Sequence, residues 1–360
     1  MRYSTILIAL GLAASSVSAA GAAGRVPGPA ERIPAASGVY QGSIIGSLGT
    51  IATIGSTVDP VNGDVNPYGL TVSPAAGGEI NLGDLVVCNF NDSLNIQGLG
   101  TSIDLLAPVV GSKPRHLIAN PVLTGCAALA MGGSSPWVAA LDANDNPIIS
   151  DGGQVLDPIN NYAWTGAWGQ VFVSGPKSTA AFYESNANDG SVVRINLSSP
   201  FTFDKIAVGF PVNHGVPGGI LAPSGLTYDP TRDVLYVIDG AVNSVIAIAN
   251  PATIPGGGII VKNGVIGGPF GSRATILFKG APLNAPISAA LLFNGDLVVG
   301  NTGNNKLLEF TPAGKLVGQK VLDSGTAGAL FGIAATGTSK ATTNIYFNDD
   351  NDNTVKVLTH

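Results

Sequence analysis

Residues 233–248 read DVLYVIDGAVNSVIAI and set two apolar runs on either side of a polar centre, DGAVN. Apolar runs of this length joined by a short turn-forming segment are typical of a β-hairpin. Asp239 and Asn243 border the polar centre. Their side chains could belong to a site that performs chemistry, or they could form the turn that a hairpin requires. The number of copies of this pattern in the chain decides between the two.

The hairpin pattern recurs along the whole chain. Clear copies are AAFYESNANDGSVVRI (180–195), GDLVVGNTGNNKLLEF (295–310) and TNIYFNDDNDNTVKVL (343–358), and weaker ones are GDLVVCNFND (83–92) and SPWVAALDAND (135–145). A shorter apolar segment precedes each hairpin, and further apolar segments between the units supply a fourth strand. In each unit the first hairpin strand ends on Asn or Asp, at Asn89, Asp142, Asn186, Asp239, Asn301 and Asp349.

Six four-stranded units predict an all-β fold, a six-bladed β-propeller of antiparallel blades. The last unit has three strands before His360, whereas GSIIGSLGTIATIGSTV (42–58) is apolar and β-branched. We therefore expect this N-terminal segment to supply the missing strand and close the ring, in one domain over residues 42–360. Two packed β-sandwiches would leave the continuous repeat unexplained.

The composition agrees with many short strands and tight turns. Of 360 residues, 45% are hydrophobic and 11% are charged, with 49 Gly and 24 Pro. A fold of long charged helices is disfavoured by such a composition. The net charge is -6 and no run of Lys or Arg occurs, so neither a nucleic acid nor an anionic membrane surface is the expected partner.

The N-terminus predicts export. MRYSTILIALGLAASSVSA combines a basic residue, a short apolar stretch and small residues at its end, which is typical of a signal peptide over residues 1–19. The apolar run is too short to cross a membrane. Residues 20–41 are then a linker, and the expected location is periplasmic or extracellular. An oxidising compartment permits Cys88 and Cys126 to pair, and two free buried thiols remain the alternative.

The repeat P-x-G-L, strand, Asx, N-x-[VIL] resembles the NHL-repeat propellers, and PSGLTYDPTRDVLYVIDGAVNSVIAI (223–248) is close to one full repeat. The chain is also similar to exported bacterial NHL-repeat proteins in which NPYGLTV, GDLVVCNFND and GSVVRINL recur in this order. The resemblance covers about residues 42–360. It implies a six-bladed propeller and says little about chemistry, because one fold serves many functions.

The six Asn and Asp residues that end the hairpin strands are the first candidate site. A ring of such oxygens could hold Ca²⁺, which takes six to eight oxygen ligands. The same side chains accept hydrogen bonds from backbone N–H groups two residues on, and the spacing in DGAVN is suited to such an Asx turn. We prefer the turn interpretation, with Ca²⁺ as the open alternative and no other cofactor implied.

Two enzymatic alternatives come from propellers that the fold resembles. Gluconolactonase-like propellers hold a divalent cation in the channel with Glu, Asn and Asp. None of the four Glu of this chain falls on an expected inner strand: they are Glu31, Glu79, Glu184 and Glu309. Zinc-dependent or histidine-based lyases need several His ligands, and His116, His214 and His360 are a poor supply.

Loops on a rigid scaffold are where binding residues concentrate. Asn213 and His214 lie in such a loop, in PVNHGVPGG, and Trp164 and Trp168 lie in NNYAWTGAWG, where they could stack on a sugar or fill the core. The sequence thus predicts an exported binding or scaffolding propeller for a protein, small-molecule or carbohydrate ligand, without evident catalytic machinery. The alternative is a divalent-metal-dependent hydrolase.

Overall fold

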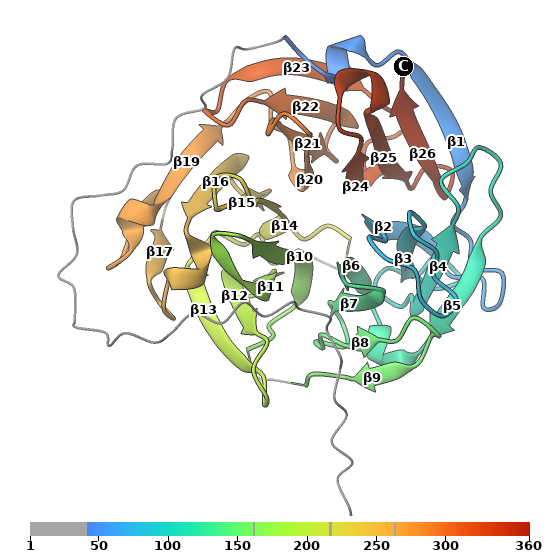
Figure 1. The fold of residues 1–360 in the computed structure, drawn as a ribbon, viewed down its shortest axis with the longest axis horizontal. Coiled ribbons are helices and arrows are strands. Elements are labelled where there is room, and N and C mark those ends of the chain that lie inside the picture. The colour runs from blue at the N-terminus through green and yellow to red at the C-terminus, as the bar shows by residue number, and fades with distance from the viewer. Residues whose placement is uncertain (1–41, 161–162, 216–217, 263) are drawn as a thin grey trace, which may run out of the picture.

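The computed structural model describes residues 42–160, 163–215, 218–262 and 264–360. These residues form six sheets arranged around a central axis, as Figure 1 shows. The fold is therefore the six-bladed β-propeller that the repeats predict. The expected signal peptide and the whole of the expected linker, with Glu31, lie outside the described residues.

Each blade is an antiparallel meander whose first strand lies nearest the axis. Blades 1 to 3 consist of β2 (Val65–Val72), β3 (Leu85–Asn91), β4 (Ser102–Leu106) and β5 (Arg115–Ala119); of β6 (Cys126–Gly132), β7 (Ser135–Ala140), β8 (Ile148–Ile149) and β9 (Val155–Asp157); and of β10 (Ala167–Gly175), β11 (Ser178–Asn186), β12 (Ser191–Asn196) and β13 (Thr202–Val208). Blades 4 and 5 consist of β14 (Pro223–Asp229), β15 (Val234–Asp239), β16 (Ser244–Ala249) and β19 (Ala274–Lys279); and of β20 (Pro286–Leu291), β21 (Leu297–Asn301), β22 (Lys306–Phe310) and β23 (Leu316–Val321). The helical segments among the described residues are short 3-10 helices: η1 (Ile45–Ser47), η2 (Pro121–Leu123), η3 (Pro251–Thr253), η4 (Gly271–Arg273) and η5 (Lys340–Thr342).

Blade 6 closes the ring with strands from both parts of the sequence. It contains β24 (Leu330–Thr336), β25 (Asn344–Asp349) and β26 (Thr354–Thr359), and its outer strand is β1 (Thr50–Ser56). Strands β1 and β26 pair antiparallel, with Thr50 opposite Thr359. The predicted N-terminal closing strand is confirmed.

A buried glutamate fixes the segment that leads into β1. Glu309 on β22 accepts hydrogen bonds from the backbone N–H groups of Ile44 (2.9 Å) and Ile45 (3.0 Å) and from the hydroxyl of Ser43 (2.6 Å). Its side chain is fully buried. Blade 5 thus holds the chain in position before it reaches blade 6.

The inner strands share one packing device. Every pairing between a first and a second strand contains a β-bulge close to its start, beside a small residue. A Cβ added at Gly169 would lie 1.9 Å from the backbone oxygen of Ser224, and one at Gly332 would lie 2.5 Å from that of Tyr68. Neighbouring blades therefore approach closely through their backbones here, and small residues occupy the six equivalent positions: Gly69, Ala128, Gly169, Gly225, Ser288 and Gly332.

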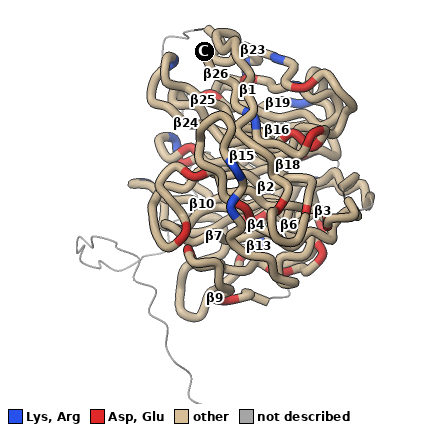
Figure 2. Tube along the Cα trace, turned by 90° about the vertical axis from the view of Figure 1, so that its right-hand side faces the viewer, with Lys and Arg blue, Asp and Glu red and all other residues tan. Residues whose placement is uncertain are grey.

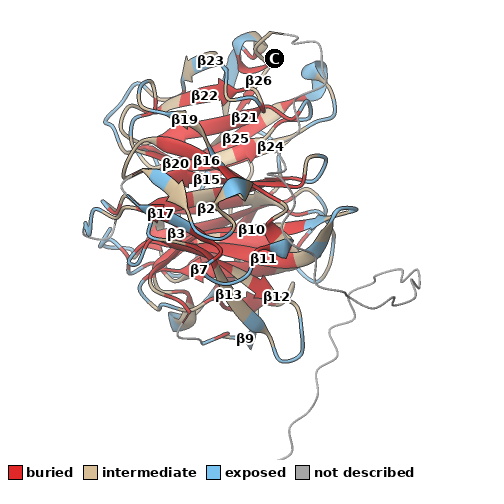
Figure 3. Cartoon of the chain, turned by 90° about the vertical axis from the view of Figure 1, so that its left-hand side faces the viewer, coloured by how far each residue is buried: buried red, intermediate tan, exposed pale blue. Residues whose placement is uncertain are grey.

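Buried side chains follow the strands, whereas the exposed positions gather in the loops and outer edges (Figure 3). The glycine-rich run 255–271, which the sequence suggests is a loop, instead forms a hairpin of β17 (Ile259–Lys262) and β18 (Val265–Gly267). Strand β17 adds in parallel to β13 at the outer edge of blade 3. The physical reason is burial, since Ile259 and Val261 join the core cluster between blades 3 and 4.

A disulfide joins Cys88 on β3 to Cys126 on β6, with 5.5 Å between their Cα atoms. It links blade 1 to blade 2 and resolves the alternative that the sequence leaves open. Among the described residues, no helix is both long and apolar enough to span a membrane. In Figure 2, Lys and Arg residues appear as short, separated blue segments along the chain.

Candidate functional site

The central channel is lined mainly by apolar side chains and backbone. Between the six inner strands lies an open cavity of about 90 Å³. Gln170 and Ser288, with the hydroxyl of Tyr68, supply the polar side-chain groups of this lining, and no carboxylate is among the described lining residues. The other side chains are those of Leu70, Ala127, Ala128, Leu129, Trp168, Leu226, Ile287, Ala289, Phe331 and Ile333.

Aromatic rings gather at the mouth where the inner strands begin. Tyr68 stacks on Phe331 (ring centroids 3.7 Å apart) and on Phe90 (4.1 Å), and Trp168 packs edge-on against Tyr68 (5.9 Å). A second pocket of about 230 Å³ opens beside them. It is lined by Trp168, Gly218, Ile220, Leu221, Ile287, Thr302, Gly303, Ala327, Gly328 and Phe331.

The two predicted binding tryptophans take different places. Trp168 lies at the mouth with 5% of its surface exposed. Trp164 is 1% exposed, packs edge-on against Phe203, and donates its ring N–H to the backbone oxygen of Ile159 (2.7 Å). The structure places Trp164 in the core between blades 2 and 3. Trp164 therefore fills the core, whereas Trp168 lines both the channel cavity and the mouth pocket.

The loop that carries Asn213 and His214 borders the mouth, since Ile220 and Leu221 line the pocket. Asn213 uses its side chain to close this loop: its Oδ1 accepts from the N–H groups of Gly215 (3.1 Å) and Leu221 (2.8 Å). His214 is exposed and does not line the described pocket. Asn213 therefore shapes the rim rather than presenting a free polar group.

Four of the six predicted Asn and Asp positions are engaged within their own blades. Asp239 Oδ1 accepts from the N–H of Ala241 (3.0 Å), and Asp349 Oδ1 accepts from that of Asn351 (3.2 Å), which are the expected Asx turns. Burial raises the pKa of Asp239 to about 6 against the effect of these backbone bonds.

Asn186 and Asn301 hold a different part of the blade. Asn186 Oδ1 accepts from the N–H of Thr165 (3.0 Å), and Asn301 Oδ1 accepts from that of Asn284 (3.1 Å). Both side chains thereby fasten the connection that precedes the inner strand. Asp142 follows β7 and is exposed.

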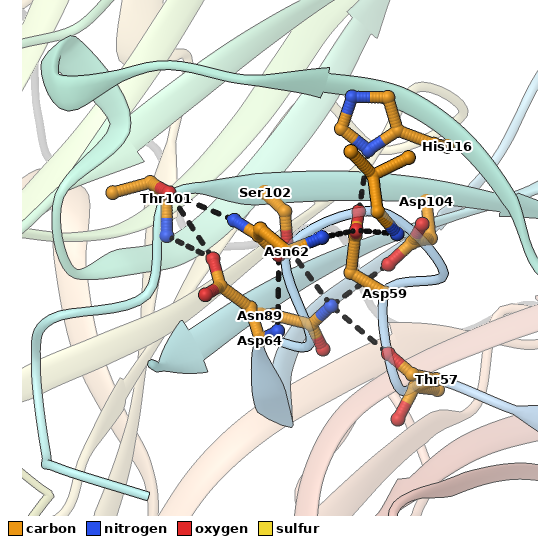
Figure 4. A network of polar contacts seen from close by, with 10 residues as sticks. Thr57, Asp59, Asn62, Asp64, Asn89, Thr101, Ser102, Asp104 and His116 are labelled. Atoms are coloured by element: carbon orange, nitrogen blue, oxygen red, sulfur yellow. Dashed lines mark hydrogen bonds and ion pairs between the residues drawn. The ribbon is translucent and has the colours of Figure 1, made fainter. Parts of the chain in front are cut away.

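Asn89 is the exception, because it belongs to a buried polar cluster in blade 1 (Figure 4). Its Nδ2 donates to the backbone oxygen of Thr57 (2.9 Å) and to Asp104 Oδ2 (2.8 Å). Asp104 on β4 lies opposite His116 on β5. The ring of His116 contacts Asp59 through Nδ1 and Oδ2, which are 2.6 Å apart. Asp59 comes from the connection between β1 and β2.

The pKa values of the two carboxyl groups in this cluster are shifted in opposite directions. Burial, together with the nearby charge of Asp59, raises the pKa of Asp104 to about 9. Burial also opposes ionisation of Asp59, but hydrogen bonds from His116 and from the N–H groups of Asn62 and Val61 outweigh it and lower its pKa. Sequence reasoning missed both aspartates. The available signal was a charged residue inside the apolar strand SIDLL.

A second buried acid lies between blades 2 and 3. Glu184 on β11 is fully buried and accepts a hydrogen bond from Asn146 Nδ2. Asn146 in turn accepts from Nε2 of Gln170 (3.0 Å), a residue that lines the channel. Burial raises the pKa of Glu184 well above its usual range. A chain of polar groups therefore connects the channel to a buried acid whose pKa is raised.

No protein-family model and no curated protein matches this sequence. Among solved structures, it is similar to a gluconolactonase from Xanthomonas campestris, with a TM-score of 0.57 and 13% identity over 86% of this chain and 89% of that chain. It is also similar to a catalytically inactive virginiamycin B lyase from Staphylococcus aureus with quinupristin, with a TM-score of 0.52 and 17% identity over 86% of this chain and 99% of that chain. At these identities the likeness concerns the fold alone.

Proposed function

We propose that the protein is a binding propeller that takes an apolar group of its ligand into the channel mouth. The observation that carries this proposal is the mouth itself, a pocket of about 230 Å³ walled by Trp168, Ile220, Ile287 and Phe331. Concave, mainly apolar pockets with few polar groups are typical ligand sites. The loop of Asn213 and His214 borders this pocket, and Ile220 and Leu221 at its end form part of the wall.

The channel lining favours binding over hydrolysis assisted by a divalent cation. A cation there needs several converging oxygen ligands, usually carboxylates. The polar side chains of the described lining are those of Gln170, Ser288, Thr71 and Thr227, with the hydroxyl of Tyr68, and no carboxylate is among them. The similarity to a gluconolactonase concerns the fold and does not imply that this chain has the metal ligands of an enzyme.

Export and membership of the NHL-repeat class are part of the proposal. The Cys88–Cys126 disulfide supports export, because such bonds persist in oxidising compartments. The N-terminal signal-like segment and the six repeated units, two of which contain P-x-G-L (67–70 and 223–226), support the exported NHL type with a periplasmic or extracellular location.

A fluorescent apolar probe, 8-anilinonaphthalene-1-sulfonate, tests the mouth directly. We expect the folded protein to bind it, and Leu221→Glu, which places a charge in the pocket, to weaken binding about tenfold or more. The matched control is Leu156→Glu on β9, where the side chain is already 37% exposed. Equal probe affinity in the two variants would contradict the proposal. Hydrolysis of a simple lactone that depends on added Ca²⁺ or Zn²⁺ would support the hydrolase instead.

A further inference from the structure

The polar cluster of blade 1 brings together three side chains that ligate metals. Asp59, Asp104 and His116 each offer one ligand atom, and these atoms lie within 4.8 Å of one another. They come from three separate segments: the β1–β2 connection, β4 and β5. We propose that they bind one divalent transition-metal ion of the zinc class, which fastens the ring-closing connection to blade 1.

The backbone holds the ligands in place without an ion. Asp104 and His116 are directly opposed in the antiparallel pairing of β4 and β5, so their side chains leave the same face of the sheet. Asp59 Oδ1 accepts from the N–H groups of Val61 (2.6 Å) and Asn62 (2.8 Å). Those two bonds leave the other oxygen, Oδ2, facing His116. The site is therefore preorganised by turn and strand geometry.

An unpartnered buried oxygen points to a ligand at this place. Asp104 is fully buried, and its Oδ1 has no hydrogen-bond partner, while its Oδ2 is held by Asn89. Asn89 Oδ1 and Thr57 Oγ1, on the residues next to it, are also buried without a partner. Buried polar atoms of this kind are uncommon and unfavourable. A cation bound to Asp104 Oδ1 removes the defect, and Asn89 then orients the ligating carboxylate from behind.

The ligand types select the ion. Ca²⁺ and Mg²⁺ prefer oxygen ligands alone, whereas zinc accepts an imidazole nitrogen together with carboxylates. With bonds of about 2.1 Å, two ligand atoms of a tetrahedral zinc lie about 3.4 Å apart. Asp59 Oδ2 and His116 Nδ1 are 2.6 Å apart, so they must separate by about 0.8 Å on binding. His116 can make this movement, since it lies on the outermost strand of the blade with 25% of its side chain exposed.

Metal binding by the untagged, disulfide-bonded chain tests the proposal. The protein is first stripped with a chelator and then given Zn²⁺, Ca²⁺ or Mg²⁺. We expect about one zinc per chain by elemental analysis, and a rise in Tm of about 4 °C at a hundredfold excess over Kd. Chelator reverses the rise, and Ca²⁺ and Mg²⁺ give a smaller one. A larger shift with Ca²⁺ than with Zn²⁺ would overturn the assignment.

Variants separate loss of a ligand from loss of the fold. Asp104→Asn and His116→Gln are expected to abolish the zinc content and the zinc-dependent rise in Tm. Asp104→Asn keeps the shape of the side chain, so its Tm in chelator stays equal to that of the wild type or exceeds it. The controls His360→Gln and Asp142→Asn, at exposed positions, retain zinc binding. Identical melting of the wild-type protein with and without zinc would overturn the proposal.

Discussion

The six inner strands, here called the inner ring, and the polar cluster of blade 1 use their buried positions in opposite ways. In the inner ring, six nearly equivalent strands bring small residues against the backbone of the next blade and line the channel with apolar side chains. The blade 1 cluster occurs at one place and buries two carboxyl groups beside an imidazole. Residues that recur in every blade serve packing. Residues that depart from the repeat, although burying them is unfavourable, are where chemistry should be sought.

The largest effect is expected where a repeated small residue is replaced. The Cβ of Gly169→Ala would lie 1.9 Å from the backbone oxygen of Ser224, so blades 3 and 4 must separate. We expect a loss of more than about 4 kcal/mol in the free energy of unfolding, or no folded protein. Urea unfolding measures it. Gly49→Ala is the control, because nothing lies within 4 Å of its added Cβ. Similar losses in the two variants would refute the packing role of the inner ring.

The disulfide connects the two regions, since Cys88 faces blade 2 while its neighbour Asn89 faces the polar cluster. Its cysteines are separated by 38 residues, which corresponds to about 4 kcal/mol of stabilisation through the unfolded state. We expect the double change Cys88→Ala and Cys126→Ala to lower the free energy of unfolding by about 2–4 kcal/mol. Reduction of the wild-type protein should have a similar effect. An unchanged urea midpoint after both treatments would contradict this expectation.

A smaller effect is expected at the anchor of the closing strand. In Glu309→Gln one N–H group, of Ile44 or Ile45, faces an amide donor instead of a carboxylate oxygen. The expected loss is about 1–3 kcal/mol, with faster hydrogen exchange at these two amides. The exposed Glu79→Gln serves as the control. Unaltered exchange at Ile44 and Ile45 would show that Glu309 does not hold the segment.

The smallest effect is a change in pH dependence at Glu184. Its pKa in the folded protein lies well above the ordinary value of 4.5, so above that pH the folded state binds more protons than the unfolded state. The free energy of unfolding therefore falls as pH rises, by up to about 1.4 kcal/mol per pH unit. Glu184→Gln removes this contribution, and urea unfolding at about pH 5 and about pH 7 measures the difference in slope. Parallel slopes would exclude a protonated Glu184.

Sequence reasoning predicted the parts of the fold that repeat. The alternation of apolar residues, the Asx turns of Asp239 and Asp349 and the closing strand all follow from local pattern. The hairpin of β17 and β18 was not predicted, because its glycine-rich flanks conceal a short β-branched strand. Trp164 and Trp168 sit in the same segment, and only the blade packing decides that one of them is in the core and the other at the mouth.

The blade 1 cluster could not be predicted in the same way. Asp59, Asp104 and His116 lie in three segments without a shared spacing, and they meet only through the register of β4 and β5 and the turn after β1. Three scattered histidines predict no metal site, because the number of histidines in a sequence does not show which side chains meet in the fold. The other two ligands of the proposed site are aspartates. Whether an aspartate can ligate a metal depends on its burial and on which of its oxygens lack a hydrogen-bond partner, and neither can be read from the sequence.

The seam of the ring has a mechanical consequence. Thr50 begins β1 and pairs with Thr359 at the end of β26, so the chain segments before β1 and after β26 depart from the same edge of blade 6. A pulling force applied through those segments loads one end of the β1–β26 pairing and separates its residue pairs in succession. The segment before β1 is also held by Glu309 of blade 5, so a pull on it loads those hydrogen bonds first and the β1–β26 pairing next. The propeller should therefore open at blade 6 under tension, with five blades still folded.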